Sequence, residues 1–365
     1  MDFKNIAIIG VGLIGGSLGL SIKRKFKNVE VTGVSSPATL EAALESQVID
    51  QGFTYDQMVD SLKTADLVIL CTPISHILQI LPEVIKNAKS GALITDAGST
   101  KQQIVTLADA HARKDVYFLG GHPMAGNEGR GVQWADPLLF ENAVYVLTPS
   151  QSIPDKLFKS MVLLIETIGA KALTLPPDLH DQVAAAISHL PQIVAVALMN
   201  VLIEKQESSS LFLRLAAGGF RDMTRIASSP FHVWKDIIHT NQDNIRNAIE
   251  SLIDELTSIQ KILIDPALEE KFTQSAQYRL SIPRDTKGFL RPNFDISINV
   301  EDKPGVIAKI ANLLAAENIN IKDIEVLKVR EGDSGTIRLS LESEEARTQA
   351  QSLFEQHHII SRYRK

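Results

Sequence analysis

The chain has 365 residues, of which 44% are hydrophobic, and its 37 basic and 43 acidic side chains give a formal net charge of −6. Its length suggests two or three domains, each able to bury a core without a disulfide or a metal. The acidic balance argues against nucleic acid or an anionic membrane as partner, and the single cysteine, Cys71, excludes an intramolecular disulfide and a cysteine-cluster metal site.

The N-terminus lacks the basic region, apolar core and cleavage site of a signal peptide. The longest mostly apolar stretch, residues 190–203, is too short to span a bilayer. We therefore expect a soluble, cytoplasmic protein.

Short apolar runs alternate with helix-length segments over the first half of the chain. The runs cover residues 6–9, 29–34, 67–71, 92–95, 117–119 and 143–147. Strands that are apolar on both faces and separated by helices indicate a parallel sheet covered on both sides. We predict an α/β domain with a doubly wound parallel sheet over residues 1–172.

A glycine-rich turn follows the first apolar run. Gly10, Gly12 and Gly15 form a GxGxxG pattern around Leu13 and Ile14. The first glycine permits a tight turn, the second lets the backbone approach a pyrophosphate, and the third lets helix and strand pack closely. The N–H groups at the start of the following helix would bind the phosphates. This context predicts a Rossmann-like domain that binds NAD or NADP.

The ends of the second and third runs are further candidates for nucleotide contacts. An acidic residue after the second strand normally binds the ribose 2′-hydroxyl of NAD, but this chain has Ser35 and Ser36 there. No carboxylate is present there to repel the 2′-phosphate of NADP, and no neighbouring arginine is present to hold it. The sequence is therefore compatible with either nucleotide. Thr72 and Pro73 end the third strand at the same expected crevice.

Two later strand ends carry candidate catalytic groups. His122 lies in the glycine-rich segment 120–126, and Ser99 lies in the segment 96–101. An imidazole that titrates near neutrality suits a general base. We predict that His122 is this base and that Ser99 hydrogen-bonds and orients it.

From about residue 177 the pattern becomes helical. Apolar residues at helical spacing form broad stripes within residues 187–198 and 245–263. Because such stripes often cover a second subunit, we predict an all-α dimerisation domain over residues 173–283. Its glycine pair at 218–219 precedes Arg221 and Arg225, which suit a carboxylate. We find no metal-binding helix motif and expect no metal.

A separate module ends the chain after a proline-containing linker, residues 281–292. We predict a strand at 294–300, a helix at 306–314, a β-rich stretch at 319–329, a strand at 336–341, a polar helix, and a last strand at 358–360. The order βαββαβ indicates a ferredoxin-like domain over residues 292–365.

Together these segments resemble a known enzyme family. Residues 10–16, 96–101, 120–126, 188–191 and 216–227 are similar, in this order, to motifs of bacterial prephenate/arogenate dehydrogenases of tyrosine biosynthesis. The blocks GGHPMAG and RDMTRIA are the most specific. The C-terminal module resembles an ACT regulatory domain. The resemblance implies oxidative decarboxylation of prephenate to 4-hydroxyphenylpyruvate, with hydride transfer to NAD(P)⁺.

The resemblance also implies roles for single residues. His122 would take the proton of the ring 4-hydroxyl, Ser99 would hydrogen-bond this histidine and the substrate, and Arg225 would bind a substrate carboxylate. The other implied pocket residues are Glu128, His189, Gln192, Asp222 and Trp234.

Two positions depart from the common family pattern. Gln192 replaces the last histidine of SHLPH, and Ser35 stands where many NAD-specific members carry Asp. Both departures occur in the branch that uses arogenate and NADP, whereas the ACT-like module points to the prephenate branch. We predict prephenate as substrate, with an arogenate or dual cyclohexadienyl dehydrogenase as the alternative.

The ACT-like module implies feedback control, and we predict tyrosine as the effector of a homodimer. The alternative is a module that only dimerises. The residues that match the effector site are Asp302, Pro304, Gly305, Val306, Asn318 and Asn320.

Two other functions would require different residues. A β-hydroxyacid or phosphoglycerate-type dehydrogenase would need a catalytic lysine motif, which residues 177–240 do not contain. A non-catalytic dinucleotide sensor would not need His122, Ser99 and Arg225 together.

Overall fold

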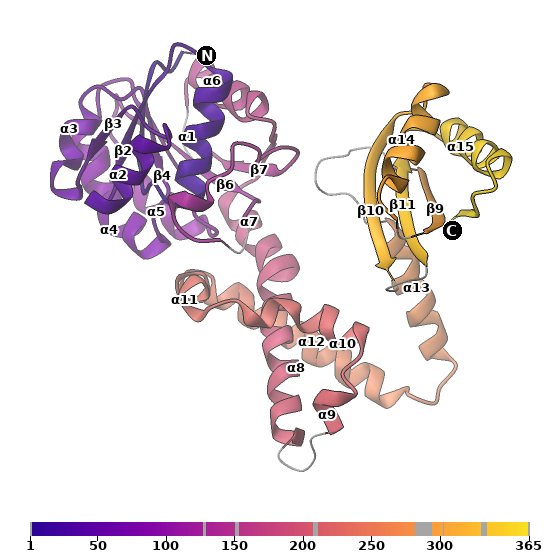
Figure 1. The fold of residues 1–365 in the computed structure, drawn as a ribbon. Coiled ribbons are helices and arrows are strands. Elements are labelled where there is room, and N and C mark those ends of the chain that lie inside the picture. The colour runs from indigo at the N-terminus through magenta and orange to yellow at the C-terminus, as the bar shows by residue number, and fades with distance from the viewer. Residues whose placement is uncertain are drawn as a thin grey trace. The chain divides into compact units, whose positions relative to one another are not determined.

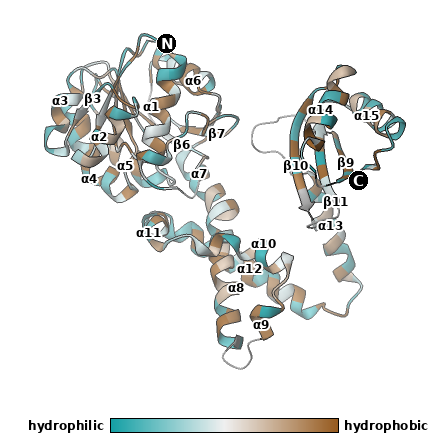
Figure 2. Ribbon diagram, viewed as in Figure 1, coloured by the Kyte–Doolittle hydropathy of each residue, from teal (hydrophilic) through white to brown (hydrophobic). Residues whose placement is uncertain are grey.

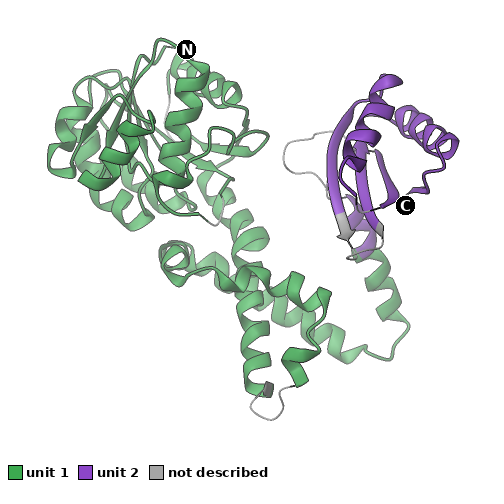
Figure 3. Cartoon of the chain, viewed as in Figure 1, with its two compact units in different colours: residues 1–275 green, residues 276–365 purple. Residues whose placement is uncertain are grey.

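The structure, a computed structural model, describes residues 2–126, 129–149, 153–206, 211–281, 294–301, 303–329 and 334–363. The chain divides into two compact units, Met1–Ser275 and Ala276–Lys365 (Figure 3). The first unit contains both the sheet and the helices that we predicted as separate domains (Figure 1). The boundaries near residues 172 and 283 remain predictions.

An eight-stranded sheet in the order β3-β2-β1-β4-β5-β6-β7-β8 forms the core of the first unit. Its elements are β1 (Asn5–Ile9), α1 (Leu13–Lys25), β2 (Glu30–Val34), α2 (Pro37–Glu45), β3 (Gln51–Phe53), α3 (Met58–Leu62), β4 (Leu67–Leu70), α4 (Ile74–Asn87), β5 (Leu93–Asp96), α5 (Gln102–Ala110), β6 (Tyr117–Pro123), β7 (Val144–Thr148), α6 (Asp155–Thr167) and β8 (Lys171–Thr174).

The sheet is buried on both faces. In β1, Ile6 and Ile8 pack into one hydrophobic cluster with residues of α1 and α6, while Ala7 and Ile9 pack into another with residues of α4 and α5. This alternation confirms the doubly wound arrangement. The short edge strands β3 and β8 were not predicted, because neither contains an apolar run on both faces.

One feature of the sheet corrects the prediction of a wholly parallel arrangement. The strand β6 pairs parallel with β5, but its residues from Gly120 to Pro123 pair antiparallel with β7. Neighbouring parallel strands need a crossover, usually a helix. The described part of this connection contains only a 3₁₀ turn, Val132–Trp134. The strands β7 and β8 therefore run opposite to the other six.

The rest of the first unit is helical. Its elements are α7 (Pro177–Ala184), a π-helical turn (Ala185–His189), α8 (Leu190–Gln206), α9 (Leu211–Arg214), α10 (Gly218–Thr224), a 3₁₀ turn (Arg225–Ser228), α11 (Phe231–Thr240), α12 (Gln242–Lys261) and the start of α13 (Ala267–Ser281). Hydrophobic residues are prominent along α8 and α9 (Figure 2).

The apolar stretch in α8 belongs to a longer helix than we predicted. Pro177–Lys205 is 29 residues long with a mean hydropathy of 1.8 in its most apolar window, so length and composition alone would permit a membrane span. One such helix is weak evidence for a membrane. The same helix carries His180, Asp181 and His189, which are buried against the rest of the unit, and ionisable groups of this kind are costly in lipid.

The second unit has the predicted βαββαβ order. It consists of β9 (Phe294–Glu301), α14 (Val306–Ala316), β10 (Ile321–Val329), β11 (Ser334–Leu341), α15 (Glu344–Gln356) and β12 (Ser361–Tyr363). The sheet order is β10-β11-β9-β12, and all pairs are antiparallel. The last strand begins at Ser361 and not at 358, because His358 adopts a left-handed conformation (φ 58°) in the turn after α15. Most of the predicted linker lies outside the described residues.

Candidate active site

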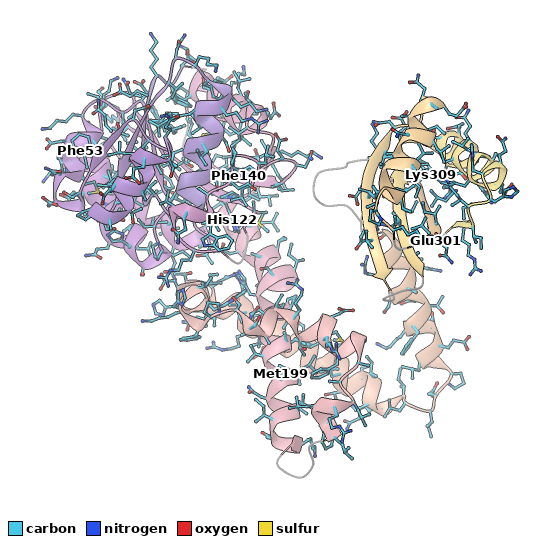
Figure 4. All side chains as sticks on the ribbon, viewed as in Figure 1. Phe53, His122, Phe140, Met199, Glu301 and Lys309 are labelled. Atoms are coloured by element: carbon cyan, nitrogen blue, oxygen red, sulfur yellow. The ribbon has the colours of Figure 1, made fainter. Side chains whose placement is uncertain are left out.

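His122 lies at the carboxyl end of β6, opposite Val146 of β7. Figure 4 shows it where the sheet meets the helical part of the first unit. The two residues before it must be glycine, because a Cβ on Gly120 would lie 2.2 Å from Thr148 Oγ1 and one on Gly121 would lie 2.5 Å from Asp96 O. The close packing of these glycines thus holds the His122 backbone at the edge where ligands of α/β sheets bind.

A fully buried ion pair ties this strand to the end of β5. The carboxylate of Asp96 accepts hydrogen bonds from Gly98 N (2.8 Å) and Gly121 N (3.1 Å), and it pairs with the Lys101 ammonium. Lys101 Nζ also donates to Gly121 O (2.6 Å). Burial lowers the pKa of Lys101, and the Asp96 charge opposes that shift. This anchoring contact of Lys101 is not predicted from the sequence.

The structure gives His122 a different partner from the one we predicted. His122 Nδ1 lies 2.8 Å from His180 Nε2, and His180 Nδ1 lies 2.8 Å from Asp181 Oδ1. Ser99 is half-buried nearby and, among the described residues, forms no hydrogen bond with His122. The orienting role of Ser99 stays a prediction, since α7 brings His180 to His122 Nδ1 and leaves His122 Nε2 without a described partner.

The pKa of His122 lies well below its usual value of 6.5. Burial disfavours the imidazolium form, and His180, Lys101 and His189 add unfavourable charge interactions. As a whole residue, His122 is half-buried and not fully buried. Its Nε2 has no hydrogen-bond partner within the described part of the chain. A neutral imidazole with one accessible nitrogen can accept a proton from a ligand.

His189 lies beside the same network. Asn241 Nδ2 is 3.2 Å from His189 Nδ1 and 2.8 Å from the Asp181 carbonyl oxygen. Burial lowers the pKa of His189 to about 4. Its ring meets that of Trp234 edge to face, with centroids 6.0 Å apart, and Trp234 Nε1 donates to Ser229 Oγ (2.9 Å).

The π-helical turn explains how one helix presents both histidines. His180 and His189 are nine residues apart, so an unbroken α-helix would place them about 180° apart. A π-helical turn accommodates one extra residue and changes this angle by about 100°. Asn241 Nδ2 thereby contacts both the Asp181 carbonyl oxygen, next to His180, and the His189 ring.

The structure places the other predicted pocket residues in different environments. Gln192 is buried one turn after His189, whereas Asp222 in α10 and Arg225 in the following 3₁₀ turn are exposed. Within the described ranges neither of these two hydrogen-bonds to His122, His180 or His189. Glu128 lies outside the described residues.

The glycine turn fits a dinucleotide. Gly10 has φ +97°, a conformation that favours glycine, and a Cβ on Gly15 would lie 2.2 Å from Gly10 O. A Cβ on Gly12 would meet nothing within 4 Å, so this backbone is open to a pyrophosphate. The helix α1 begins at Leu13, with Ile14 next, and its first turn has no side-chain cap and no acidic residue. Its N–H groups are thus available to phosphates.

The strands β2 and β4 pair parallel with β1 on either side, so they end at the same edge of the sheet as the glycine turn. Thr72 is buried, and its Oγ1 has no hydrogen-bond partner among the described residues. Pro73 begins α4 as its N-cap residue. After β2, the Ser35 side chain is hydrogen-bonded to Tyr55, and Ser36 Oγ lies 2.9 Å from Thr39 Oγ1. The end of β2 therefore offers hydroxyl groups.

The predicted effector residues lie in the second unit. Pro304 and Gly305 lead into α14, which begins at Val306, and Gly305 adopts a left-handed conformation (φ +89°). The predicted facing segment, with Asn318 (φ 60°) and Asn320, precedes β10. Asp302 lies outside the described residues. No group of three or more His, Cys, Asp or Glu side chains in the described ranges could hold a metal ion.

Comparison with protein families matches three parts of the chain. Residues 18–174 match the family described as prephenate dehydrogenase, nucleotide-binding domain. Residues 176–276 match prephenate dehydrogenase, dimerization domain. Residues 296–356 match the AHAS small subunit-like ACT domain.

Relatives match nearly the whole chain. A protein from Bacillus subtilis (strain 168) named prephenate dehydrogenase is 37% identical over 358 residues, which cover 96% of this chain and 95% of the relative. The crystal structure of prephenate dehydrogenase from A. aeolicus in complex with hydroxyphenyl propionate and NAD⁺ is 30% identical, with a TM-score of 0.71, and the match covers 77% of this chain and 99% of that one. Synechocystis arogenate dehydrogenase is 31% identical, with a TM-score of 0.67 and coverage of 75% and 98%.

Proposed function

The chain belongs to the prephenate dehydrogenase family of oxidoreductases, and we propose that it catalyses the oxidative decarboxylation of prephenate to 4-hydroxyphenylpyruvate in tyrosine biosynthesis. The observation that carries this proposal is His122. Its neutral, partly accessible imidazole stands at the carboxyl end of the sheet that also holds the dinucleotide turn.

In the proposed reaction, a pyridine nucleotide held at the glycine turn would supply the acceptor for the hydride on the ring carbon that bears the 4-hydroxyl. The bond to the ring carboxylate breaks, CO₂ leaves, and its electron pair completes the aromatic ring. His122 Nε2 takes the hydroxyl proton as the hydride departs and returns it to the oxygen of the phenol, so no proton is gained or lost overall. Because aromatisation drives the step, the protein mainly needs a base, an anion clamp and correct alignment.

We assign substrate binding to the helical part of the unit. Arg225 would hold a carboxylate as a bidentate partner, with Asp222 and Glu128 at the pocket wall. His189, Gln192 and Trp234 would surround the side chain of the substrate, and Ser99 would bind the 4-hydroxyl. The Gln192 amide can donate and accept hydrogen bonds, so it is compatible with the pyruvyl side chain of prephenate and with the aminoacyl side chain of arogenate.

The nucleotide could be NAD⁺ or NADP⁺, because Ser35 and Ser36 neither repel nor clamp a 2′-phosphate. We assign Gly10, Gly12, Leu13, Ile14 and Gly15 to its pyrophosphate. Thr72 and Pro73 would contact it from the end of β4, where the Thr72 hydroxyl is buried without a described partner.

We further propose a homodimer that tyrosine inhibits through the ACT-like unit. The homodimer is supported by exposed apolar side chains in the region that matches a dimerization domain, such as Val201 and Ile203 of α8, which are 58% and 54% exposed. Sedimentation equilibrium would measure the number of chains. We assign the effector to the turn of Asp302, Pro304, Gly305 and Val306 together with the facing Asn318 and Asn320.

The test is an assay of nucleotide reduction that crosses prephenate and arogenate with NAD⁺ and NADP⁺. The proposal predicts turnover with prephenate, and the better nucleotide would settle what Ser35 leaves open. Turnover with arogenate alone would favour the arogenate dehydrogenase of the alternative. No turnover while dinucleotide still binds would overturn the proposal and favour the sensor.

A further inference from the structure

We propose that His180, held by Asp181, is a positioning residue that fixes the tautomer of His122 and so keeps its Nε2 free to accept the substrate proton. The inference rests on the proposed role of His122 as base. It is carried by one continuous arrangement, in which Asp181, His180 and His122 follow one another at 2.8 Å spacings. The first two side chains are 1% and 3% exposed.

Asp181 determines which atom donates in each hydrogen bond of this arrangement. Its carboxylate accepts from Lys101 N (2.7 Å) and Gln102 N (2.9 Å), which fixes it at the start of α5. An ionised carboxylate can only accept, so His180 must carry its proton on Nδ1 and donate it. In the proposed arrangement, the other ring nitrogen of His180, Nε2, carries the lone pair and faces His122 Nδ1 at 2.8 Å. His122 Nδ1 must therefore be the donor in the bond between the two rings, and the lone pair of His122 lies on Nε2.

The assignment of donors and acceptors along Asp181, His180 and His122 matters for the reaction. If His180 were turned or doubly protonated, its Nε2 would donate to His122 Nδ1, and neutral His122 would carry its proton on the nitrogen that should accept one. With the proposed order, the proton from the 4-hydroxyl enters Nε2 and the imidazolium keeps its Nδ1–H bond to His180. The Asp181 charge lies beyond that second ring and stabilises the transient cation. The proton later returns to the phenol, so His180 exchanges none.

The variants for the test are His180→Phe and His180→Gln. Phenylalanine fills the space of the ring but offers no acceptor to His122, whereas the glutamine amide oxygen can accept from His122 Nδ1. Asp181 is left unchanged, because it also holds α5 and its loss would disturb the fold. His111→Gln is the matched control, since His111 is an exposed histidine of the same unit whose Nδ1 lies 3.0 Å from the Leu107 carbonyl oxygen of its own helix turn.

The first measurement is ¹⁵N NMR of the full-length protein with labelled histidine, which reports the protonated ring nitrogen without any substrate. We expect His122 to carry its proton on Nδ1 in the wild type and in His111→Gln, and to lose this preference in His180→Phe. A wild-type His122 protonated on Nε2 would overturn the inference whether or not the chain oxidises prephenate.

The second measurement is steady-state kinetics. We expect His180→Phe to lower kcat by about 10²–10⁴-fold, the range from loss of a general base to loss of a triad's orienting group, with little change in the KM of prephenate or of the nucleotide. His180→Gln should recover part of this loss. A folded His180→Phe variant with wild-type kcat would overturn the inference, whereas absence of activity in the wild type would overturn the proposed function alone.

Discussion

The lowered pKa of His122 predicts how the reaction depends on pH. Around this ring stand His180, His189 and Lys101, with the carboxylates of Asp96 and Asp181 behind them. A base acts in its neutral form, which exists above its pKa. We expect kcat/KM for prephenate to stay level from pH 8 to about the ordinary histidine value of 6.5 and to fall only at lower pH. A pH profile at saturating nucleotide checks this, and an acid limb centred at or above 6.5 would contradict it.

Substitutions at two positions of the glycine turn should separate an effect on nucleotide binding from an effect on the stability of the fold. In Gly12→Ala the new methyl group meets no protein atom, so we expect an unchanged melting temperature and a nucleotide Kd raised tenfold or more, about 1.4 kcal/mol or above. In Gly15→Ala the methyl group would strike Gly10 O, which should destabilise the unit by about 1–3 kcal/mol. Calorimetric melting and fluorescence titration measure both quantities. Weak binding by Gly15→Ala with normal binding by Gly12→Ala would contradict the assignment.

A deletion can test whether the π-helical turn, Ala185–His189, positions His189. Deleting Ile187, whose side chain is 64% exposed, should convert the turn to α-helix and rotate α8 by about 100° relative to α7. We expect His189 to leave Asn241 and kcat/KM for prephenate to fall by about 10²-fold or more, while dinucleotide binding by the sheet persists.

Ile187→Ala keeps the chain length and is the control for the deletion. It should retain nearly wild-type kcat/KM, since the side chain contributes little to the buried network. A deletion variant with normal kinetics would show that the turn does not position His189.

The same element shows how far the sequence could predict the site. Motifs singled out His122, His189 and the glycine turn as candidates, because each motif consists of residues close together in the chain. The His180–Asp181 pair was visible as a neighbouring histidine and aspartate, but its partners lie at His122, Lys101 and Gln102, at least 58 residues away. No local pattern marks the π-helical turn or the antiparallel pairing of β6 with β7, since both depend on tertiary packing.

Regulation belongs to the scale of the whole molecule. If tyrosine acts through the ACT-like unit, a chain truncated after Thr286 should keep prephenate oxidation and lose inhibition by tyrosine. The full-length chain assayed in parallel is the control, because its active-site residues are identical. Dose–response curves for tyrosine measure the difference. Equal inhibition of the two chains would place the effector site in the first unit.

We propose that oxidation and decarboxylation form one reaction that depends on His122. The most direct measurement follows radiolabelled CO₂ from the ring carboxylate of prephenate together with nucleotide reduction, in the wild type and in His122→Asn. We predict one CO₂ per reduced nucleotide, with both rates lowered together by about 10²–10⁴-fold in the variant and the nucleotide Kd unchanged. CO₂ release without reduction, or a variant as fast as the wild type, would contradict the account.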